Sequence, residues 1–277
     1  MSNPEDPTRF RAIGRKSVRL SLTPRDLMEG EVLARAWAAH VITLFPQAFP
    51  GVLGQSLTGK ALAEGLWQLH THDLRDHGEG PHRKVDDTPA GGGPGLVLRP
   101  DILARAITVA QNMAAPGTPL IYLSPRGARF DQAQARALAA GPGAILICGR
   151  FEGLDDRVLT HFNVQEVSLG DFVLTGGEIA AQALIDATVR LIPRVLGNQG
   201  SIEEESFSEG LLEHPQYTKP AVWEGHAIPE VLLSGHHAKV VSWRKAMAAR
   251  LTKERRPDLW RAYCAMHGLN PDEEPKL

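Results

Sequence analysis

Residues 166–205 have the sequence EVSLGDFVLTGGEIAAQALIDATVRLIPRVLGNQGSIEEE. A short apolar piece leads into a turn with Gly170 at one end and Gly176-Gly177 at the other, and a strong helical pattern follows over residues 178–192. Glycine has no Cβ and tolerates positive φ, so main-chain atoms of such a turn can approach a ligand closely. N–H groups also stay free at the start of a helix. The segment therefore predicts a strand, a turn suited to hold a nucleotide-like ligand by main-chain contacts, and a helix.

The rest of the chain alternates short apolar runs with helical patterns, which is typical of an α/β fold. The expected strands are Val41–Leu44, Leu66–Thr71, Leu120–Leu123 and Ala144–Cys148. The expected helices are Thr58–Leu66, Arg99–Met113, 131–140 and 178–192. The run at Ala144–Cys148 is continuously apolar, which indicates a strand of a parallel sheet that is covered on both faces. A loop over residues 78–95 is of a length that is usually functional or disordered.

The helix expected over residues 178–192 has two different faces. Apolar residues spaced i, i+4, i+7 and i+11 form one stripe, which consists of Ala180, Leu184, Ala187 and Leu191. The opposite face carries Glu178, Gln182, Asp186 and Arg190. Because Asp186 lies four residues before Arg190, the residues alone favour an ion pair between the two on the helix surface.

Composition limits the class of protein. The chain has 277 residues and 43% hydrophobic content, enough for one large domain or two smaller ones with a real core. No apolar run approaches the roughly 18 residues that a membrane span needs. The N-terminus carries Glu5 and Asp6 and lacks the apolar region of a secretory signal. Two cysteines, Cys148 and Cys264, cannot form a disulfide framework, so we expect a cytoplasmic protein that does not enter a membrane.

Shifts in composition divide the chain into four parts. Residues 1–36 are polar, Arg-rich and weakly periodic, and we expect a poorly ordered extension there. The α/β pattern occupies residues 37–196, and residues 197–208 have the composition of a linker. Residues 209–277 form a helix-rich unit whose expected main helices are Ala238–Leu251 and Pro257–His267.

Cations crowd residues 239–261 of the helix-rich unit, although the net charge of the chain is −2. They are Lys239, Arg244, Lys245, Arg250, Lys253, Arg255, Arg256 and Arg261, and few acids lie among them. Such a cluster is typical of a surface that binds a polyanion, and we therefore expect a nucleic-acid partner. A solvated helix face is the plainer interpretation of the same residues.

Residues 54–60, with the sequence GQSLTGK, fit the first positions of a phosphate-binding P-loop. That motif needs a Ser or Thr after the lysine and a strand in front of the first glycine. Ala61 follows instead, and Pro46 and Pro50 interrupt the preceding segment. The pattern therefore does not support nucleoside triphosphate binding.

Two further patterns carry chemistry in other proteins. His70, His72, His77 and His82 suggest metal ligation, but they lack a Cys or carboxylate partner at a zinc spacing, and we expect no metal site. Cys148 lies inside an apolar strand, where an inert core thiol is favoured over a nucleophile.

Five segments together resemble one enzyme family. They are VDDTPAGGGPG at 85–95, LIYLSPRG at 120–127, LICGRFEGLD at 146–155, LLEHPQYTKP at 211–220 and VLLSGHH at 231–237. With residues 168–178, in this order and spacing, they resemble the bacterial tRNA (guanine-N1) methyltransferases of the knotted SPOUT superfamily. The resemblance runs from about Ala38 to about Trp260. It implies a parallel sheet with a deep C-terminal trefoil knot, followed by a small helical tRNA-binding domain.

The resemblance also implies the reaction. A methyl group would pass from S-adenosyl-L-methionine to N1 of the guanine 3′-adjacent to the anticodon, position 37 of tRNA. Arg190 would stabilise negative charge on guanine O6, which reverses the preference for a surface pair with Asp186. Glu205 would be the general base on N1, at a position where the family has an aspartate. Its side chain is one methylene longer, so the same chemistry is expected with altered geometry.

By the same resemblance, three loops form the methyl-donor pocket. Its expected residues are Tyr122, Leu123, Ser124, Pro125, Gly149, Phe151, Glu152, Gly153, Ser168, Leu169, Gly170, Asp171, Phe172, Val173, Leu174, Gly176 and Gly177. This chain departs from the family at two positions. Ala90 stands where the family often has an aromatic residue, and Phe151 stands where it has a tyrosine. Magnesium is compatible with the reaction, but no group of residues in the sequence indicates a site for it.

The resemblance further implies a homodimer in which each site combines the knot of one subunit with the linker and C-terminal unit of the other. On that arrangement we expect Arg190 and Glu205 of one site to come from different chains. The expected tRNA contacts are Arg244, Lys245, Lys253, Arg255 and Arg256. Two alternatives stay open: a related enzyme that methylates ribose or another base, and a catalytically silent RNA-binding protein.

Overall fold

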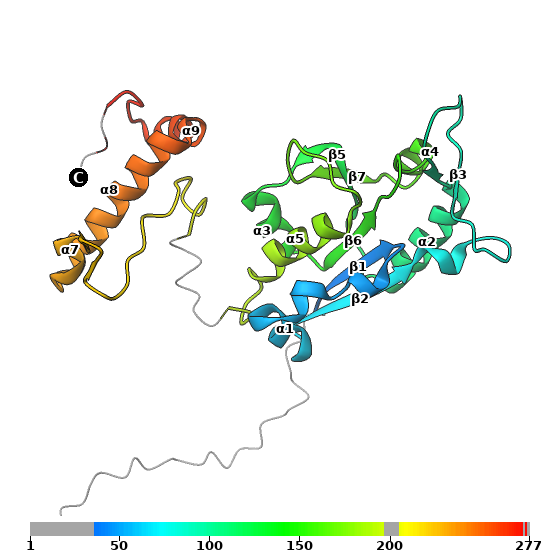
Figure 1. The fold of residues 1–277 in the computed structure, drawn as a ribbon, viewed down its shortest axis with the longest axis horizontal. Helices are drawn as coiled ribbons and strands as arrows, with labels where there is room; N and C mark the ends of the chain where they lie inside the picture. The colour runs from blue at the N-terminus through cyan, green and yellow to red at the C-terminus, as the bar shows by residue number, and fades with distance from the viewer. Residues whose placement is uncertain (1–35, 197–204, 274, 276–277) are drawn as a thin grey trace, which may run out of the picture. The chain divides into compact units, whose positions relative to one another are not determined.

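A five-stranded parallel sheet forms the centre of the α/β part of the chain. The computed structural model describes residues 36–196, 205–273 and 275. The strands are β1 (Trp37–Thr43), β2 (Trp67–Asp73), β5 (Leu120–Arg129), β6 (Gly143–Cys148) and β7 (Gln165–Ser168), in the order β2-β1-β6-β5-β7. Every neighbouring pair is parallel (Figure 1). The prediction of an α/β fold with a parallel sheet is confirmed.

Helices cover both faces of this sheet. One face packs against α1 (Ser56–Ala63), α3 (Gln132–Ala139) and α5 (Glu178–Val189), and the other against α2 (Pro100–Met113) and α4 (Asp156–His161). Short 3₁₀ turns occur at Pro46–Ala48, Gly51–Gly54 and Leu74–His77. All six residues of β6 are buried, because side chains on both of its faces enter a core. The continuous apolar run expected at Ala144–Cys148 therefore has the environment that the sequence predicted.

Strand β5 extends well past the expected Leu120–Leu123 because it contains a bulge. Val167 of β7 pairs with Leu123 and again with Ala128, so the four residues from Ser124 to Gly127 are inserted between them. A Cβ on Gly127 would lie 2.3 Å from the nitrogen of Val167, a distance that no side chain permits. Bulges of this kind redirect the chain next to functional sites. Here the bulge turns the segment Ser124-Pro125 away from the sheet.

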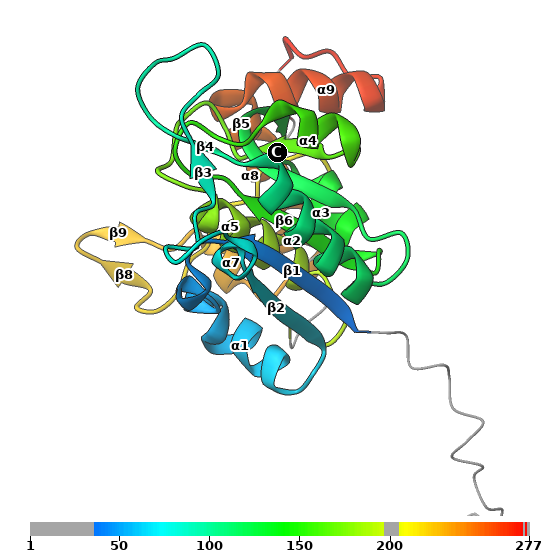
Figure 2. The same cartoon turned by 90° about the vertical axis from the view of Figure 1, so that its right-hand side faces the viewer.

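The long loop expected over residues 78–95 is partly ordered by pairing. It contains β3 (Asp86–Asp87), which is antiparallel to β4 (Val97–Leu98), and Figure 2 shows this pair from the side. The nitrogen of Leu98 donates to the carbonyl of Gly153, and the nitrogen of Glu152 donates to the carbonyl of Leu96. The loop is thus held against the segment that follows β6.

The C-terminal unit is a small helical assembly. Its elements are a hairpin of β8 (Val222–Trp223) and β9 (His226–Ala227), and the helices α7 (Glu230–Leu233), α8 (His237–Arg255) and α9 (Pro257–His267). Leu211, Ala249, Trp260, Tyr263 and Cys264 form its core. The bounds of α9 match the prediction. Helix α8 runs four residues past the expected end at Leu251 and stops before Pro257, where the proline disfavours helical backbone at Arg256.

Helix α5 corrects two expectations. It ends at Val189 rather than Ile192, and its buried residues do not follow the expected stripe. Ala180 and Leu184 are buried as expected, whereas Ala187 is only half-buried. Further buried residues are Ala181, Ile185, Thr188 and Val189. Glu178 was expected on the polar face, but only 4% of it is exposed. The helix packs on β1 and β6 and also contacts α3 and the 3₁₀ turn at Gly51–Gly54, so it is surrounded on more sides than a surface helix.

Some expectations fall outside the described residues. These are the order of residues 1–35 and of residues 197–204, which include Glu203 and Glu204. The sequence also gave no expectation of α4, α7 or the hairpin. No helix in the described parts of the chain combines the length and the apolar character that crossing a membrane requires.

Candidate functional site

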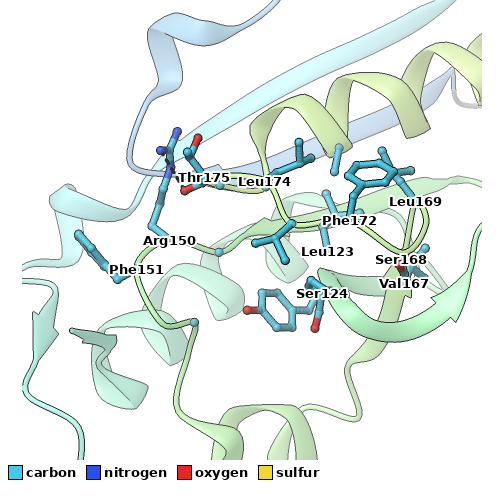
Figure 3. Close-up of a pocket in the computed structure, with 18 of the residues that line it drawn as sticks. Leu123, Ser124, Arg150, Phe151, Val167, Ser168, Leu169, Phe172, Leu174 and Thr175 are labelled. Carbon is cyan, nitrogen blue, oxygen red and sulfur yellow. Dashed lines mark hydrogen bonds between the residues drawn. The ribbon is translucent and has the colours of Figure 1, made fainter. Parts of the chain in front are cut away.

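A cavity of about 260 Å³ opens where β5, β6 and β7 end. Its walls come from three segments: residues 122–125 of β5 and its bulge, residues 149–153 after β6, and residues 167–177 after β7. Figure 3 shows Arg150 and Phe151 at one end of the cavity and Leu169 and Phe172 at the other. The carboxyl ends of adjacent parallel strands are where open α/β sheets bind ligands. The volume is near the lower end of the range for ligand pockets, about 300–1,000 Å³.

The structure brings together nearly all residues that were expected at the methyl-donor pocket. All of them line this cavity except Asp171, whose side chain is exposed on the turn. Arg150 and Thr175 also line the cavity, and both lie within the expected pocket segments 149–153 and 168–177. Two lining residues were not expected, namely Val167 and Ala180. Val167 directly precedes the expected segment at Ser168, which was the signal that could have found it.

Glycines make two of the cavity walls bare main chain. A Cβ on Gly149 would lie 2.7 Å from Cε2 of Tyr122, and one on Gly177 would lie 2.6 Å from Cα of Cys148. The nitrogen of Gly177 also donates to the carbonyl of Gly149, at 3.0 Å. A flat, polar and hydrogen-bonding ligand can therefore approach peptide groups directly. These walls are suited to a nucleoside-like ligand.

Phe151 has a backbone conformation that a bulky residue rarely adopts. Its φ is +58°, in the left-handed region, and its side chain is 51% exposed at the cavity mouth. Backbone in this region costs about 1–3 kcal/mol for a non-glycine residue and persists where the surroundings enforce it. The hydrogen bonds of Glu152 with Leu96 and of Gly153 with Leu98 supply that enforcement.

Arg190 and Glu205 form an ion pair. Nη1 of Arg190 donates to Oε2 of Glu205 at 2.6 Å, and Nη2 donates to Oε1. The expected surface pair of Arg190 with Asp186 is wrong, because the guanidinium is directed to Glu205, while Asp186 accepts from Thr58. Both partners belong to the one chain described here. The expectation that one site takes them from different subunits stays a prediction. The two sequence-predicted catalytic side chains are therefore in contact within this chain.

The ion pair changes the acidity of Glu205. Hydrogen bonds from Arg190 lower the pKa of the carboxyl, and this effect outweighs its partial burial, which acts in the opposite direction. The same contact raises the pKa of Arg190. Glu205 is therefore ionised at neutral pH, which is the form that accepts a proton.

A second hollow, also about 260 Å³, lies beside Glu205 in the C-terminal unit. It is lined by Glu205, Glu209, Leu211, Leu212, Glu213, His214, Val241, Arg244, Lys245 and Ala248. Glu213 accepts from Gln216, and its nitrogen donates to Oγ of Ser206. The hollow thus presents carboxylates and cations around an apolar floor, next to the predicted base.

The predicted tRNA contacts differ in how free they are to bind a partner. Nζ of Lys253 donates to the carbonyls of Asp272 and Glu273, and Arg256 forms two hydrogen bonds with Asp258. These contacts tie both side chains to the protein itself. Lys245 and Arg255 are exposed, and Arg244 lines the second hollow. Of the five expected residues, the exposed two have the most direct access to a polyanion.

The remaining sequence motifs form no ligand site. Residues 54–60 lie across a 3₁₀ turn and the start of α1, with no strand in front. His40 and His72 are hydrogen bonded at 3.2 Å, and His40 stacks on His70. No group of three metal-ligating side chains suited to a metal ion occurs among residues 36–196, 205–273 and 275. Cys148 is 2% exposed, and burial raises the pKa of its thiol, as an inert core cysteine requires.

Comparison with known proteins gives one consistent family. The family model described as tRNA (Guanine-1)-methyltransferase TrmD matches residues 38–262. A tRNA (guanine-N(1)-)-methyltransferase of Cereibacter sphaeroides (strain ATCC 17023) is 67% identical over 249 residues, covering 89% of this chain and all of the relative. Enzymes with the same name from Ruegeria pomeroyi and Nitrobacter winogradskyi are 65% and 58% identical, covering 88% and 86% of this chain and 98% and 97% of the relatives.

The ion pair predicts the titration of Glu205. Because Arg190 lowers the pKa of Glu205, the pair stabilises the fold at neutral pH, and that stability is lost as pH falls through the folded-state pKa. Carboxyl resonances of ¹³C-labelled protein should place the midpoint of Glu205 below the ordinary glutamate value of about 4.3. In Arg190→Ala the midpoint should move upward. An unchanged midpoint in this variant would contradict the pairing, and Asp186→Asn is the matched control.

Proposed function

Since this chain belongs to the tRNA (guanine-1)-methyltransferase family, we propose that it transfers the methyl group of S-adenosyl-L-methionine to N1 of a guanine in tRNA. The Arg190–Glu205 ion pair is the structural observation that carries the proposal. Guanine presents an N1–H donor beside the O6 acceptor on one edge. A carboxylate and a guanidinium that lie next to each other match these two groups.

The glycine-lined cavity is the proposed donor pocket. Main-chain groups of Leu169, Phe172 and Leu174 would bind the adenine, and Glu152 would lie near the amino group of the methionine part. When bound, S-adenosylmethionine supplies a methyl group on a sulfonium, which already contains a good leaving group. The tasks left to the protein are to orient the target base, remove its proton and stabilise the developing charge.

Glu205 and Arg190 would divide these tasks on the guanine. As the methyl group arrives, Glu205 takes the proton from N1, and the charge that moves to O6 is stabilised by Arg190. The guanine separates Arg190 from Glu205. Its O6 then accepts from Arg190, and its N1–H donates to Glu205. Because both side chains are partly exposed, at 29% for Arg190 and 25% for Glu205, separating them costs little.

The hollow beside Glu205 is the proposed entry for the base, and the guanine 3′-adjacent to the anticodon, position 37, is the proposed target. A base in a single-stranded loop can be unstacked for about a few kcal/mol, which makes an anticodon loop an accessible substrate. The hollow's carboxylates favour the donor-rich edge of guanine. Exposed Lys245 and Arg255 would bind phosphates of the same tRNA.

The proposal includes a deep trefoil knot and a homodimer in the cytoplasm. Gly177 packs directly against the main chain of Cys148 and Gly149. This close contact between two of the segments that line the cavity supports the proposed knot. In the dimer, the cavity of one subunit would face the Arg190–Glu205 pair and second hollow of the other. This arrangement brings donor and base together between two chains.

The first prediction for the proposed reaction tests Glu205 as the general base. With bulk tRNA, the wild-type enzyme should produce N1-methylguanosine, located by mass spectrometry of nuclease fragments. Glu205→Gln keeps the size of the side chain but cannot take the proton, so its single-turnover rate should fall by about 10²–10⁴-fold while tRNA and donor affinities stay nearly constant. Glu230→Gln, on an exposed position of α7, is the control. If Glu205→Gln is nearly fully active and Glu204→Gln is inactive, Glu205 is not the general base.

The second prediction tests the composite site. Chains with Gly149→Val, which blocks the cavity, and chains with Arg190→Ala should each be inactive. Heterodimers of the two, purified through different tags, should regain about half the wild-type activity, because one intact cavity meets one intact ion pair. Heterodimers of Arg190→Ala with Glu205→Ala should stay inactive when both residues of a site act from one chain, as proposed here, and should regain about one working site when the two residues come from different chains. Light scattering that shows a monomer at micromolar concentration would refute the arrangement.

The third prediction concerns the basic surface. Lys245 and Arg255 would release counterions on binding tRNA, so the double variant Lys245→Ala/Arg255→Ala should weaken binding and reduce the slope of log K against log salt by about one to two. Arg256→Ala should change the slope less, because this arginine is bound to Asp258. Filter binding at several salt concentrations measures both. Equal slopes for the double variant and the wild type would show that Lys245 and Arg255 do not bind tRNA phosphates and belong to a solvated helix face.

A further inference from the structure

Arg150 lines the cavity, and its side chain contacts three separate parts of the chain. Its Nη2 lies 2.8 Å from Oε2 of Glu178, and its Nη1 donates to the carbonyl of Thr175 at 3.3 Å. Its Cζ lies 4.4 Å from the centre of the Phe45 ring, in a cation–π contact. One guanidinium thus connects the loop after β6, the turn before α5 and the end of β1 (Figure 3 shows Arg150 beside Thr175).

Glu178 is the buried partner in this arrangement. It is the first residue of α5 and is 4% exposed, yet it does not line the cavity. Thr43 donates its Oγ1 hydrogen to Oε1 of Glu178 at 2.7 Å, and the same Oγ1 accepts from the nitrogen of Phe45. A buried carboxylate is costly without a cation and hydrogen bonds. Glu178 therefore holds Arg150 in one position.

The position of Arg150 sets the spacing of two cavity walls. Arg150 belongs to the wall at residues 149–153, whereas Thr175 belongs to the wall at residues 167–177. A Cβ on Gly176 would lie 2.2 Å from Nε of Arg150, so the turn passes directly against the arginine side chain. The Arg150 side chain therefore bridges the two walls.

We propose that Arg150 and Glu178 are positioning residues that hold the donor cavity in its binding shape before the donor arrives. The inference rests on the proposed function, because the donor is S-adenosylmethionine. It differs from direct recognition, in which the Arg150 guanidinium would bind the donor's carboxylate. The two roles separate at Glu178, which shapes the cavity without touching its contents.

Two donor analogues distinguish these roles. S-Adenosylhomocysteine has the amino-acid tail with its carboxylate, whereas 5′-methylthioadenosine lacks both. Calorimetry on the full chain should show that Glu178→Gln weakens binding of both ligands by the same factor, about 5- to 50-fold, which lies within the range that coupling between contacting residues produces. Arg150→Met should have the same effect on both, and the double variant should be little worse than either single one.

Steady-state kinetics add a readout that general destabilisation does not move. In Glu178→Gln, the KM for S-adenosylmethionine should rise by the factor seen in calorimetry, while kcat and the KM for tRNA stay within about twofold of wild type. Thr43→Val, which removes only the hydroxyl, should give a smaller rise of the same kind and keeps the test open if Arg150→Met does not fold. Arg157→Ala is the matched control, because its ion pair with Asp155 lies outside the cavity and leaves Arg157 80% exposed.

Each result decides the matter. Loss of S-adenosylhomocysteine binding alone in Arg150→Met, with Glu178→Gln unchanged, would overturn the positioning role in favour of direct recognition. Wild-type affinity for both ligands in Glu178→Gln and Thr43→Val would also overturn it, while leaving the methyltransferase function intact. A wild-type chain that binds neither ligand would instead refute the proposed function, and the inference with it.

Discussion

Two main-chain segments touch at Gly177, where a Cβ would lie 2.6 Å from Cα of Cys148. The nitrogen of Gly177 donates to the carbonyl of Gly149, so this contact joins the end of the central strand to the start of α5. From it follow the burial of Glu178, the next residue, and the short distance between Glu178 and Arg150. The cavity, the buried ion pair and the entry of α5 into the core all depend on a position where only glycine fits.

The electrostatics of the site separate into a buried and an accessible pair. In the first pair the Glu178 side chain is 6% exposed, so loss of Arg150, which is itself 25% exposed, would leave a charge in a poorly solvated place, which is strongly unfavourable. Arg190 and Glu205 are partly exposed, and water can replace either partner at small cost. The buried pair is suited to keep a shape, and the accessible pair is suited to open for a substrate. The same residue types thus serve different purposes because their solvation differs.

Local sequence patterns predicted the parts of the fold that depend on near neighbours. The apolar run at β6 indicated a strand buried on both faces, and Pro257, the first residue of α9, placed the start of that helix correctly. The family motifs brought the cavity residues together, with only Asp171 outside. Long-range effects were not accessible in this way. The bulge at Ser124–Gly127 depends on pairing with β7, about forty residues later. Arg190 pairs with Glu205 rather than Asp186, because a tertiary contact overrides the spacing along the helix. Glu178 seemed polar and exposed because periodicity records spacing and not what lies opposite.

The bare walls at Gly149, Gly176 and Gly177 also affect how the protein can escape an inhibitor. Resistance usually arises when a side chain that contacts a drug is exchanged for another. A compound held by the peptide groups of these walls would contact atoms that every amino acid possesses, so exchange of a side chain removes none of its hydrogen bonds. Adding a side chain would block the compound, but at Gly177 it would also collide with the strand beneath. The routes to resistance at these walls would therefore coincide with routes to a misfolded enzyme.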